Sequence, residues 1–147
     1  MINTLLIGGK GTIGSGLRTY LPKLDKEYRL TSIDLPGAVD KASDPLAQRD
    51  FIDCDVSKDD EILREALIGR DLVIYLARKD PLSDMNIMTD KVFNAIIDVC
   101  PQAVVIGSSS VHSTGGAYFP FNHEPYSTIA DRRFGDLTQW PEPLSVM

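Results

Sequence analysis

A glycine-rich loop near the N-terminus is the segment of this sequence best suited to bind a ligand. Gly8, Gly11 and Gly14 form the pattern G-x-x-G-x-x-G, and Gly9 completes the overlapping pattern G-x-G-x-x-G. Both patterns supply one glycine for a tight turn, one for the approach of a pyrophosphate to the backbone, and one for close packing of a helix against a strand. Because the loop follows an apolar run and precedes an amphipathic segment, its context predicts dinucleotide binding.

A carboxylate follows at the position where the adenosine ribose of a dinucleotide would lie. Asp34 comes 20 residues after Gly14, at the end of a second apolar run, where an acidic side chain accepts hydrogen bonds from ribose hydroxyl groups. Thr12 and Ile13 would begin the helix whose N–H groups face the pyrophosphate. The charge of Asp34 would repel the 2′-phosphate of NADP, so NAD is the expected cofactor. Lys10 could attract that phosphate, but we expect it to be a solvated loop residue.

Apolar runs and helical patterns alternate along the first two thirds of the chain. Strands are expected at residues 4–8, 29–35, 50–56, 71–77 and 103–107, with helices at 12–24, 57–69 and 83–100. Strands that alternate with helices pair in parallel through right-handed crossovers. We therefore predict an α/β fold of the Rossmann-like, doubly wound type, with about five strands in the order 3-2-1-4-5 and helices on both faces. Residues 1–147 would form one NAD(P)-binding domain, of which 108–147 is an irregular, proline-rich tail.

The periodicity also predicts how the helices pack and begin. In the first helix, the apolar positions that would face the sheet are Ile13, Leu17, Tyr20, Leu21 and Leu24. Ser57 and Ser83 are the expected N-caps of the second and third helices, because a serine oxygen accepts hydrogen bonds from free N–H groups. The third helix would turn five side chains inward, namely Met85, Met88, Val92, Ile96 and Val99. One helical turn is expected between residues 38 and 49.

Composition and charge exclude several classes of protein. The chain carries 15 Lys and Arg against 21 Asp and Glu, a net charge of −6, so a nucleic-acid partner is not expected. Cys54 and Cys100 form no C-x-x-C pair and are expected to be reduced core thiols, and two distant histidines predict no metal site. Without an apolar run of about 18 residues or a basic N-terminal leader, we expect a cytoplasmic protein with no membrane partner.

Taken together, these motifs resemble the N-terminal part of the NAD-dependent epimerase/dehydratase family, the extended short-chain dehydrogenase/reductases. The resemblance rests on the glycine loop, Asp34, the pair Asp55-Val56 and the segment that follows the fourth strand. It implies that Asp55 and Val56 contact the adenine. It also implies that the fourth-strand segment, Leu76-Ala77-Arg78, faces the glycine loop across the cofactor crevice. Arg78 departs from the family's small residue and would either pair with a phosphate or lie in solvent.

The same resemblance extends to a serine-rich segment after the fifth strand and is strongest for the uronate dehydrogenase-like branch. It implies that Ser110 is the catalytic serine that hydrogen-bonds the reacting oxygen of a substrate derived from a sugar, a sugar nucleotide or a uronate. If the alignment slips within the triple serine, the role falls to Ser109 or Ser108. His112 is the implied substrate-side residue. Three serines after a strand are also common in ordinary turns.

The family's general base, a tyrosine followed four residues later by lysine on a helix, has no counterpart beyond the serine segment. Tyr75 and Lys79 have this spacing, but they precede the serines and Tyr75 lies on a predicted strand. We therefore expect the cofactor half of an oxidoreductase, truncated before its base and substrate domain and inactive alone. The alternative is a stand-alone, non-catalytic NAD-binding sensor or partner module. Apolar surface on the helix at 84–100 would favour a homodimer.

Overall fold

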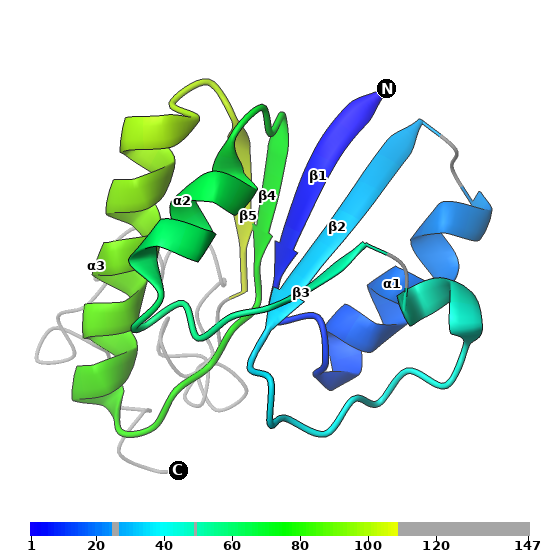
Figure 1. Ribbon diagram of the computed structural model, residues 1–147, viewed down its shortest axis with the longest axis horizontal. Coiled ribbons are helices and arrows are strands. Elements are labelled where there is room, and N and C mark those ends of the chain that lie inside the picture. Colours follow the sequence, from blue (N-terminus) through cyan, green and yellow to red (C-terminus); the bar gives the residue numbers. More distant parts are fainter. Residues whose placement is uncertain (25–26, 49, 109–147) are drawn as a thin grey trace, which may run out of the picture. The chain divides into compact units, whose positions relative to one another are not determined.

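The computed structural model describes residues 1–24, 27–48 and 50–108 (Figure 1). The chain divides into two units, Met1–Gly107 and Ser108–Met147. The helices and strands of the described residues all belong to the first unit. All but the first residue of the predicted tail lies outside the described residues.

Five strands and three α-helices follow one another along the first unit. In chain order they are β1 (Ile2–Ile7), α1 (Thr12–Leu24), β2 (Tyr28–Asp34), the short 3-10 helix η1 (Pro45–Gln48), β3 (Phe51–Asp53), α2 (Asp60–Leu67), β4 (Leu72–Tyr75), α3 (Leu82–Val99) and β5 (Val104–Gly107). The expected helical turn after residue 38 is η1. The third strand is shorter than predicted, because the chain already bends at Asp55, whose carbonyl accepts the amides of Lys58 and Asp59.

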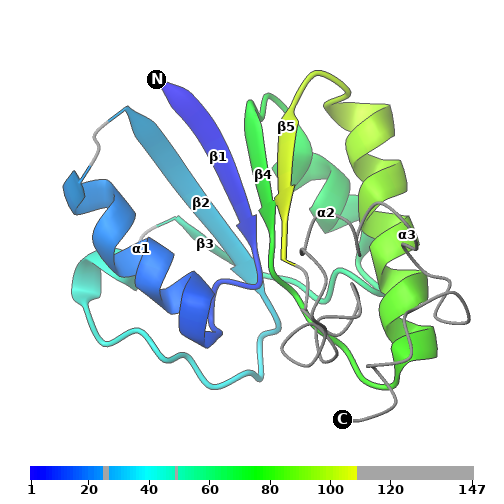
Figure 2. The same cartoon turned by 180° about the vertical axis from the view of Figure 1, so that it is seen from behind.

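The strands form one parallel sheet in the order β3-β2-β1-β4-β5, which confirms the predicted fold class. Helices α2 and α3 cover one face and α1 covers the other, as Figures 1 and 2 show from opposite sides. The chain moves outward from β1 through β2 to β3 and then crosses to β4 on the other side of β1. The order therefore reverses beside β1, where open α/β sheets bind their ligands.

The central strand is buried on both faces. Leu5 and Ile7 point into the core under α2 and α3, whereas Leu6 points to the opposite face, and none of the three is more than 1% exposed. A parallel strand covered by helices on both sides requires such a continuous apolar run. This burial fixes the carboxyl end of β1, from which the glycine loop leaves the sheet.

Helix α1 buries a different face from the one its apolar residues predict. Ile13, Tyr20 and Leu24 are all more than half exposed, so the predicted apolar stripe is wrong for these three positions. The buried residues are Gly14, Ser15 and Arg18. At Gly14 the reason is the close approach of α1 to the glycine loop, where a Cβ would lie 2.2 Å from the Gly8 carbonyl oxygen. Arg18 is buried because its Nε and Nη1 donate to the Ala47 and Gly9 carbonyls and to Asp40, while its Nη2 has no partner among the described residues.

Helices α2 and α3 pack side by side over the main core. Met88, Val92 and Ile96 are buried as predicted, whereas Met85 and Val99 are half-buried at its edge. The predicted serine caps are wrong. Asp59 and Pro81 stand at the N-cap positions of α2 and α3. The cause for α2 is that the Ser57 hydroxyl donates to the Asp55 carboxylate and so belongs to the preceding turn.

The outer face of α3 exposes apolar side chains, as expected from the sequence. Ile87 and Ile97 are each about 60% exposed, and Phe93 is 37% exposed. Homodimer formation through this face stays a prediction. Among the described helices, none is both long and apolar enough to cross a membrane.

Candidate functional site

A cavity of about 420 Å³ opens where β1, β2 and β4 end, at the point where the strand order reverses. Its lining comprises Ile7, Gly8, Lys10, Gly11, Ile33, Asp34, Leu35, Ala38, Val39, Lys41, Cys54, Asp55, Val56, Leu76, Ala77, Arg78, Lys79 and Met88. Eight of the eleven residues predicted to bind the cofactor are therefore brought together: Gly8, Gly11, Asp34, Asp55, Val56, Leu76, Ala77 and Arg78.

Two glycines of the motif are tightly packed, and one of them, Gly8, lines this cavity. Gly8 has φ +96°, and a Cβ built on it would lie 2.7 Å from the amide nitrogen of Ala77. This close approach is the predicted juxtaposition of the glycine loop with the segment after β4. Gly14 is packed as tightly, because its Cβ would lie 2.2 Å from the Gly8 carbonyl oxygen. Only glycine is compatible with either position without movement of the backbone.

The third glycine of the motif has the opposite surroundings. A Cβ on Gly11 would meet a single atom within 4 Å, the Gly8 carbonyl oxygen at 3.9 Å. Gly11 lines the cavity and stands directly before Thr12, the first residue of α1. The open space beside its Cα thus adjoins the free N–H groups at the start of a 13-residue helix, where phosphate binds favourably.

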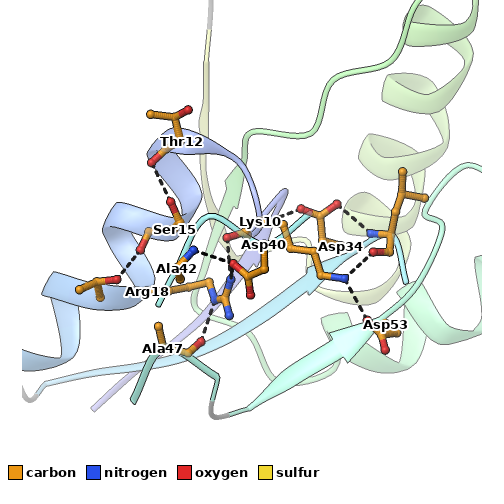
Figure 3. Close-up of polar contacts among 12 residues, drawn as sticks. Lys10, Thr12, Ser15, Arg18, Asp34, Asp40, Ala42, Ala47 and Asp53 are labelled. Atoms are coloured by element: carbon orange, nitrogen blue, oxygen red, sulfur yellow. Dashed lines mark hydrogen bonds and ion pairs between the residues drawn. The ribbon is translucent and has the colours of Figure 1, made fainter. Parts of the chain in front are cut away.

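Asp34 is held at the end of β2 by the glycine loop itself. One carboxylate oxygen accepts the Lys10 amide at 2.7 Å, and the other accepts the Leu35 amide at 2.7 Å (Figure 3). Asp34 is half-buried and lines the cavity. Because each carboxylate oxygen can accept two hydrogen bonds, both retain capacity for the hydroxyl groups of a ribose.

Lys10 is not the solvated loop residue that the sequence predicts. The residue is only 9% exposed, and its ammonium donates to the Leu35 carbonyl at 2.6 Å and lies 3.4 Å from the Asp53 carboxylate. It also lies 5.1 Å from the centre of the Phe51 ring, within the range of a cation–π contact. The ammonium therefore ties the glycine loop to β3 and to the segment after β2 (Figure 3). Because of these contacts, the Lys10 ammonium is already paired and is not available to attract a 2′-phosphate.

The segment after β3 is fixed by a polar network around Asp55. The Ser57 hydroxyl donates to the Asp55 carboxylate at 2.5 Å and accepts from the Lys79 ammonium at 2.9 Å. The Ser57 hydrogen bonds, together with the charges of Lys79 and Lys58, hold the pKa of Asp55 below its ordinary value of 3.8. Asp55 is thus an anchored, ionised carboxylate at the cavity wall.

The low pKa of Asp55 gives a pH-dependent prediction. A carboxyl group whose folded pKa lies below its unfolded value stabilises the protein above about pH 4, and that contribution is lost as the pH falls through the folded pKa. Ser57→Ala removes the largest cause of the shift, so the pKa of Asp55 should rise toward 3.8 and this contribution should shrink. Carboxyl NMR titration measures the shift. Ser57→Thr, which keeps the hydroxyl, should retain the low pKa. An unchanged pKa in Ser57→Ala would assign the effect to the lysines instead.

The polar side chains at the end of β4 and in the segment after it have different partners. Tyr75 is buried, and its hydroxyl pairs with Thr89 of α3 at 3.0 Å, while Lys79 reaches Ser57. Burial raises the pKa of Tyr75, whereas a base would need it lowered. The Tyr75/Lys79 spacing therefore forms no catalytic pair, as the sequence indicated. Arg78 is 81% exposed at the rim of the cavity and lies 3.5 Å from Asp80.

The remaining predicted site residues fall in two groups. Thr12 and Ile13 begin α1 with exposed side chains, and Gly14 is buried beneath the loop, so a contact to the cofactor from these three would come through the backbone. Ser108 is exposed directly after β5. Ser109, Ser110 and His112 lie outside the described residues.

The connection between β2 and η1 contributes cavity residues that no motif indicated, namely Leu35, Ala38, Val39 and Lys41. The chain here leaves the end of β2 and passes below α1 in the view of Figure 1 before it reaches η1. It is anchored to the glycine loop, because the Lys41 amide donates to the Lys10 carbonyl at 3.2 Å. Beyond the position of Asp34, the sequence carried no signal for these contacts.

The strands and helices define an open, doubly wound α/β fold with a cavity where the strand order reverses, and known structures show the same fold. The sequence matches no protein-family model and no curated protein. The dTDP-glucose 4,6-dehydratase of Bacillus anthracis, solved in complex with NAD, is 20% identical with a TM-score of 0.65, over 78% of this chain and 39% of that one.

Two further solved structures share this fold. A uronate dehydrogenase variant from Agrobacterium tumefaciens, complexed with NAD, is 19% identical with a TM-score of 0.52, over 77% of this chain and 42% of its own. A short-chain dehydrogenase/reductase from Veillonella parvula is 17% identical with a TM-score of 0.62, over 86% and 57%. The chain thus spans about 40% of the length of the first two enzymes. At these identities the likeness concerns the fold, which is that of the enzymes the sequence resembles.

Proposed function

We propose that this chain binds NAD and is the cofactor-binding part of an epimerase/dehydratase-type oxidoreductase that acts on a sugar-derived substrate. The observation that best supports this proposal is the open space beside Gly11. This space lies at the start of α1 and belongs to a cavity that Asp34 also lines. A dinucleotide needs this combination, because its phosphates must reach free N–H groups while its ribose meets a hydrogen-bond acceptor.

In this proposal different parts of the adenosine diphosphate moiety contact different elements of the fold. The pyrophosphate takes the N–H groups at Thr12 and Ile13, and the ribose hydroxyls donate to Asp34. The adenine lies beside Asp55 and Val56, while Leu76 and Ala77 form the wall opposite the glycine loop, as the cavity lining allows. Asp34 disfavours NADP, since its carboxylate would face a second anion and Lys10 is engaged elsewhere.

The substrate side of the proposal rests on the sequence resemblance and on the enzymes that share the fold. Ser110 would hydrogen-bond the reacting oxygen and His112 would contact the substrate. With no Tyr-x-x-x-Lys pair beyond these residues, we propose that this chain alone does not turn over substrate. A stand-alone NAD-binding module has the same cofactor site, so sugar-dependent formation of NADH is the measurement that separates a catalyst from a module.

Calorimetric titration of the chain tests the cofactor proposal. Wild type should bind NAD with micromolar affinity and NADP more weakly. Gly11→Ala places a methyl group in the open space beside the loop, so it should weaken NAD binding about tenfold or more, the equivalent of one hydrogen bond to a charged group. Stability should change by less than about 1 kcal/mol, because nothing crowds the added methyl group.

Gly16→Ala is the matched control, since its added Cβ also meets nothing within 4 Å but lies inside α1 and away from the cavity. It should leave NAD affinity unchanged. Equal affinities for NAD and NADP, or no binding of either by wild type, would overturn the proposal.

A further inference from the structure

The ammonium group of Lys41 lies at the start of α1, although Lys41 belongs to the connection between β2 and η1. Its Nζ donates to the Thr12 hydroxyl at 2.8 Å, and the residue also lines the cavity beside Gly11. Thr12 is the first residue of α1, where the partial positive charge of the helix already favours an anion. A full positive charge is thus added at the same place from a distant part of the chain.

The backbone of Lys41 is held in position by its neighbours. Its amide donates to the Lys10 carbonyl, and the adjacent Asp40 pairs with the buried Arg18 guanidinium at 2.9 Å. Upstream, the Lys10 ammonium binds the Leu35 carbonyl. Contacts on both sides therefore fix the segment that carries Lys41 against the glycine loop, and Figure 3 shows the one between Asp40 and Arg18.

The two lysines near this loop, Lys10 and Lys41, differ in burial and in the partners of their ammonium groups. Lys10 is buried and engaged by a carbonyl and a carboxylate, whereas Lys41 is exposed and has no ion pair with any of the described carboxylates. An ammonium has three N–H donors, and the Thr12 hydroxyl uses one of those on Lys41. Within the part of the chain that the structure describes, the other two donors have no partner and are available to a ligand.

We propose that Lys41 is a cofactor-binding residue whose ammonium contacts the pyrophosphate of the bound dinucleotide. The inference rests on the proposed NAD site and assigns it a residue outside the glycine motif. Its geometric basis is the contact with Thr12, because the pyrophosphate must lie beside the first N–H groups of α1 to use them. A charge-assisted hydrogen bond at this position adds both affinity and orientation.

The test compares ligands with and without the pyrophosphate. In Lys41→Gln, the affinities for NAD and ADP-ribose should each fall about tenfold, as expected for loss of one hydrogen bond to a charged group. Binding of adenosine, followed by NMR chemical-shift titration, should change less than about twofold, within the uncertainty of removing a distant charge. Lys41→Arg should recover most of the loss.

Arg29→Gln is the matched control, because it removes an exposed positive charge at the start of β2, at the end of the strand remote from the cavity. It should bind NAD as wild type does. An equal loss for adenosine, or no loss for ADP-ribose, would overturn the role of Lys41. A loss for NADP greater than that for NAD would place the ammonium at the 2′-phosphate and would also overturn it. If wild type binds neither NAD nor ADP-ribose, the proposed function itself fails, which is a distinct result.

Discussion

Replacing Arg18 with methionine should lower the free energy of unfolding by about 3–5 kcal/mol, the range found when one partner of a buried charge pair is removed. The Arg18 guanidinium is 2% exposed and donates to the carbonyls of Gly9 and Ala47 and to the Asp40 carboxylate, each at 2.8–2.9 Å. It also lies 4.6 Å from the centre of the Phe51 ring. Methionine fills the volume but leaves the carbonyl oxygens without this donor.

Urea unfolding of three variants checks this result. Arg18→Lys should fall between wild type and Arg18→Met, because an ammonium keeps the charge but cannot form the guanidinium fork. Arg64→Ala is the surface control. Its ion pairs with Asp60 and Asp98 are solvent-exposed, so their loss should leave the free energy of unfolding close to that of wild type. A cost for Arg18→Met as small as that of Arg64→Ala would mean that the buried contacts do not hold the loop.

Gly14→Ala should be the most damaging single change in the glycine loop. The added Cβ would lie 2.2 Å from the Gly8 carbonyl oxygen, so the loop or α1 must shift. We expect a stability loss of about 1–3 kcal/mol or more from overpacking. NAD affinity should fall about 100-fold, because the shift displaces at least two hydrogen bonds to the phosphates.

Gly16→Ala separates this effect from the general cost of changing a glycine in α1. Gly16 has open surroundings, so alanine there should stabilise the helix by up to about 1 kcal/mol. Thermal unfolding and NAD titration of both variants give the comparison. If Gly14→Ala retained both stability and NAD affinity, the close packing of the loop would not be needed for binding.

The sheet could be predicted because each of its strands is marked by a local apolar run in the sequence. The run that contains Leu5, Leu6 and Ile7 is apolar without alternation, which is typical of a parallel strand covered on both faces. The alternation of such runs with helical periods then limits the possible topologies to a few, since crossovers are right-handed. The strand order required no information about distant contacts.

The placement of the motif residues around one cavity was predictable for a different reason. Gly8, Gly11 and Asp34 occupy fixed offsets in a single βαβ unit, and that unit positions them through its backbone alone. Asp55 and Ala77 came from the family resemblance, and the cavity includes both.

The misplacement of Lys10 and Arg18 has one physical cause, which is the pairing of polar groups distant in sequence. Lys10 is buried because its ammonium finds Leu35 and Asp53, which are 25 and 43 residues away. Arg18 is buried because Ala47, 29 residues away, supplies a carbonyl. A residue-by-residue hydropathy pattern assigns both cations to solvent. For the same reason the sequence did not indicate the position of Lys41, whose contact with Thr12 joins residues 29 positions apart.

The ring of Phe51 lies near both buried cations, at 5.1 Å from the Lys10 ammonium and 4.6 Å from the Arg18 guanidinium. A short edge strand thereby holds both sides of the glycine loop in place before any ligand arrives. Such preorganisation means that a ligand need not supply the free energy to order the loop, so a larger share of its contacts contributes to affinity. It also means that weakening the edge strand, far from any phosphate, would reduce affinity by releasing the loop.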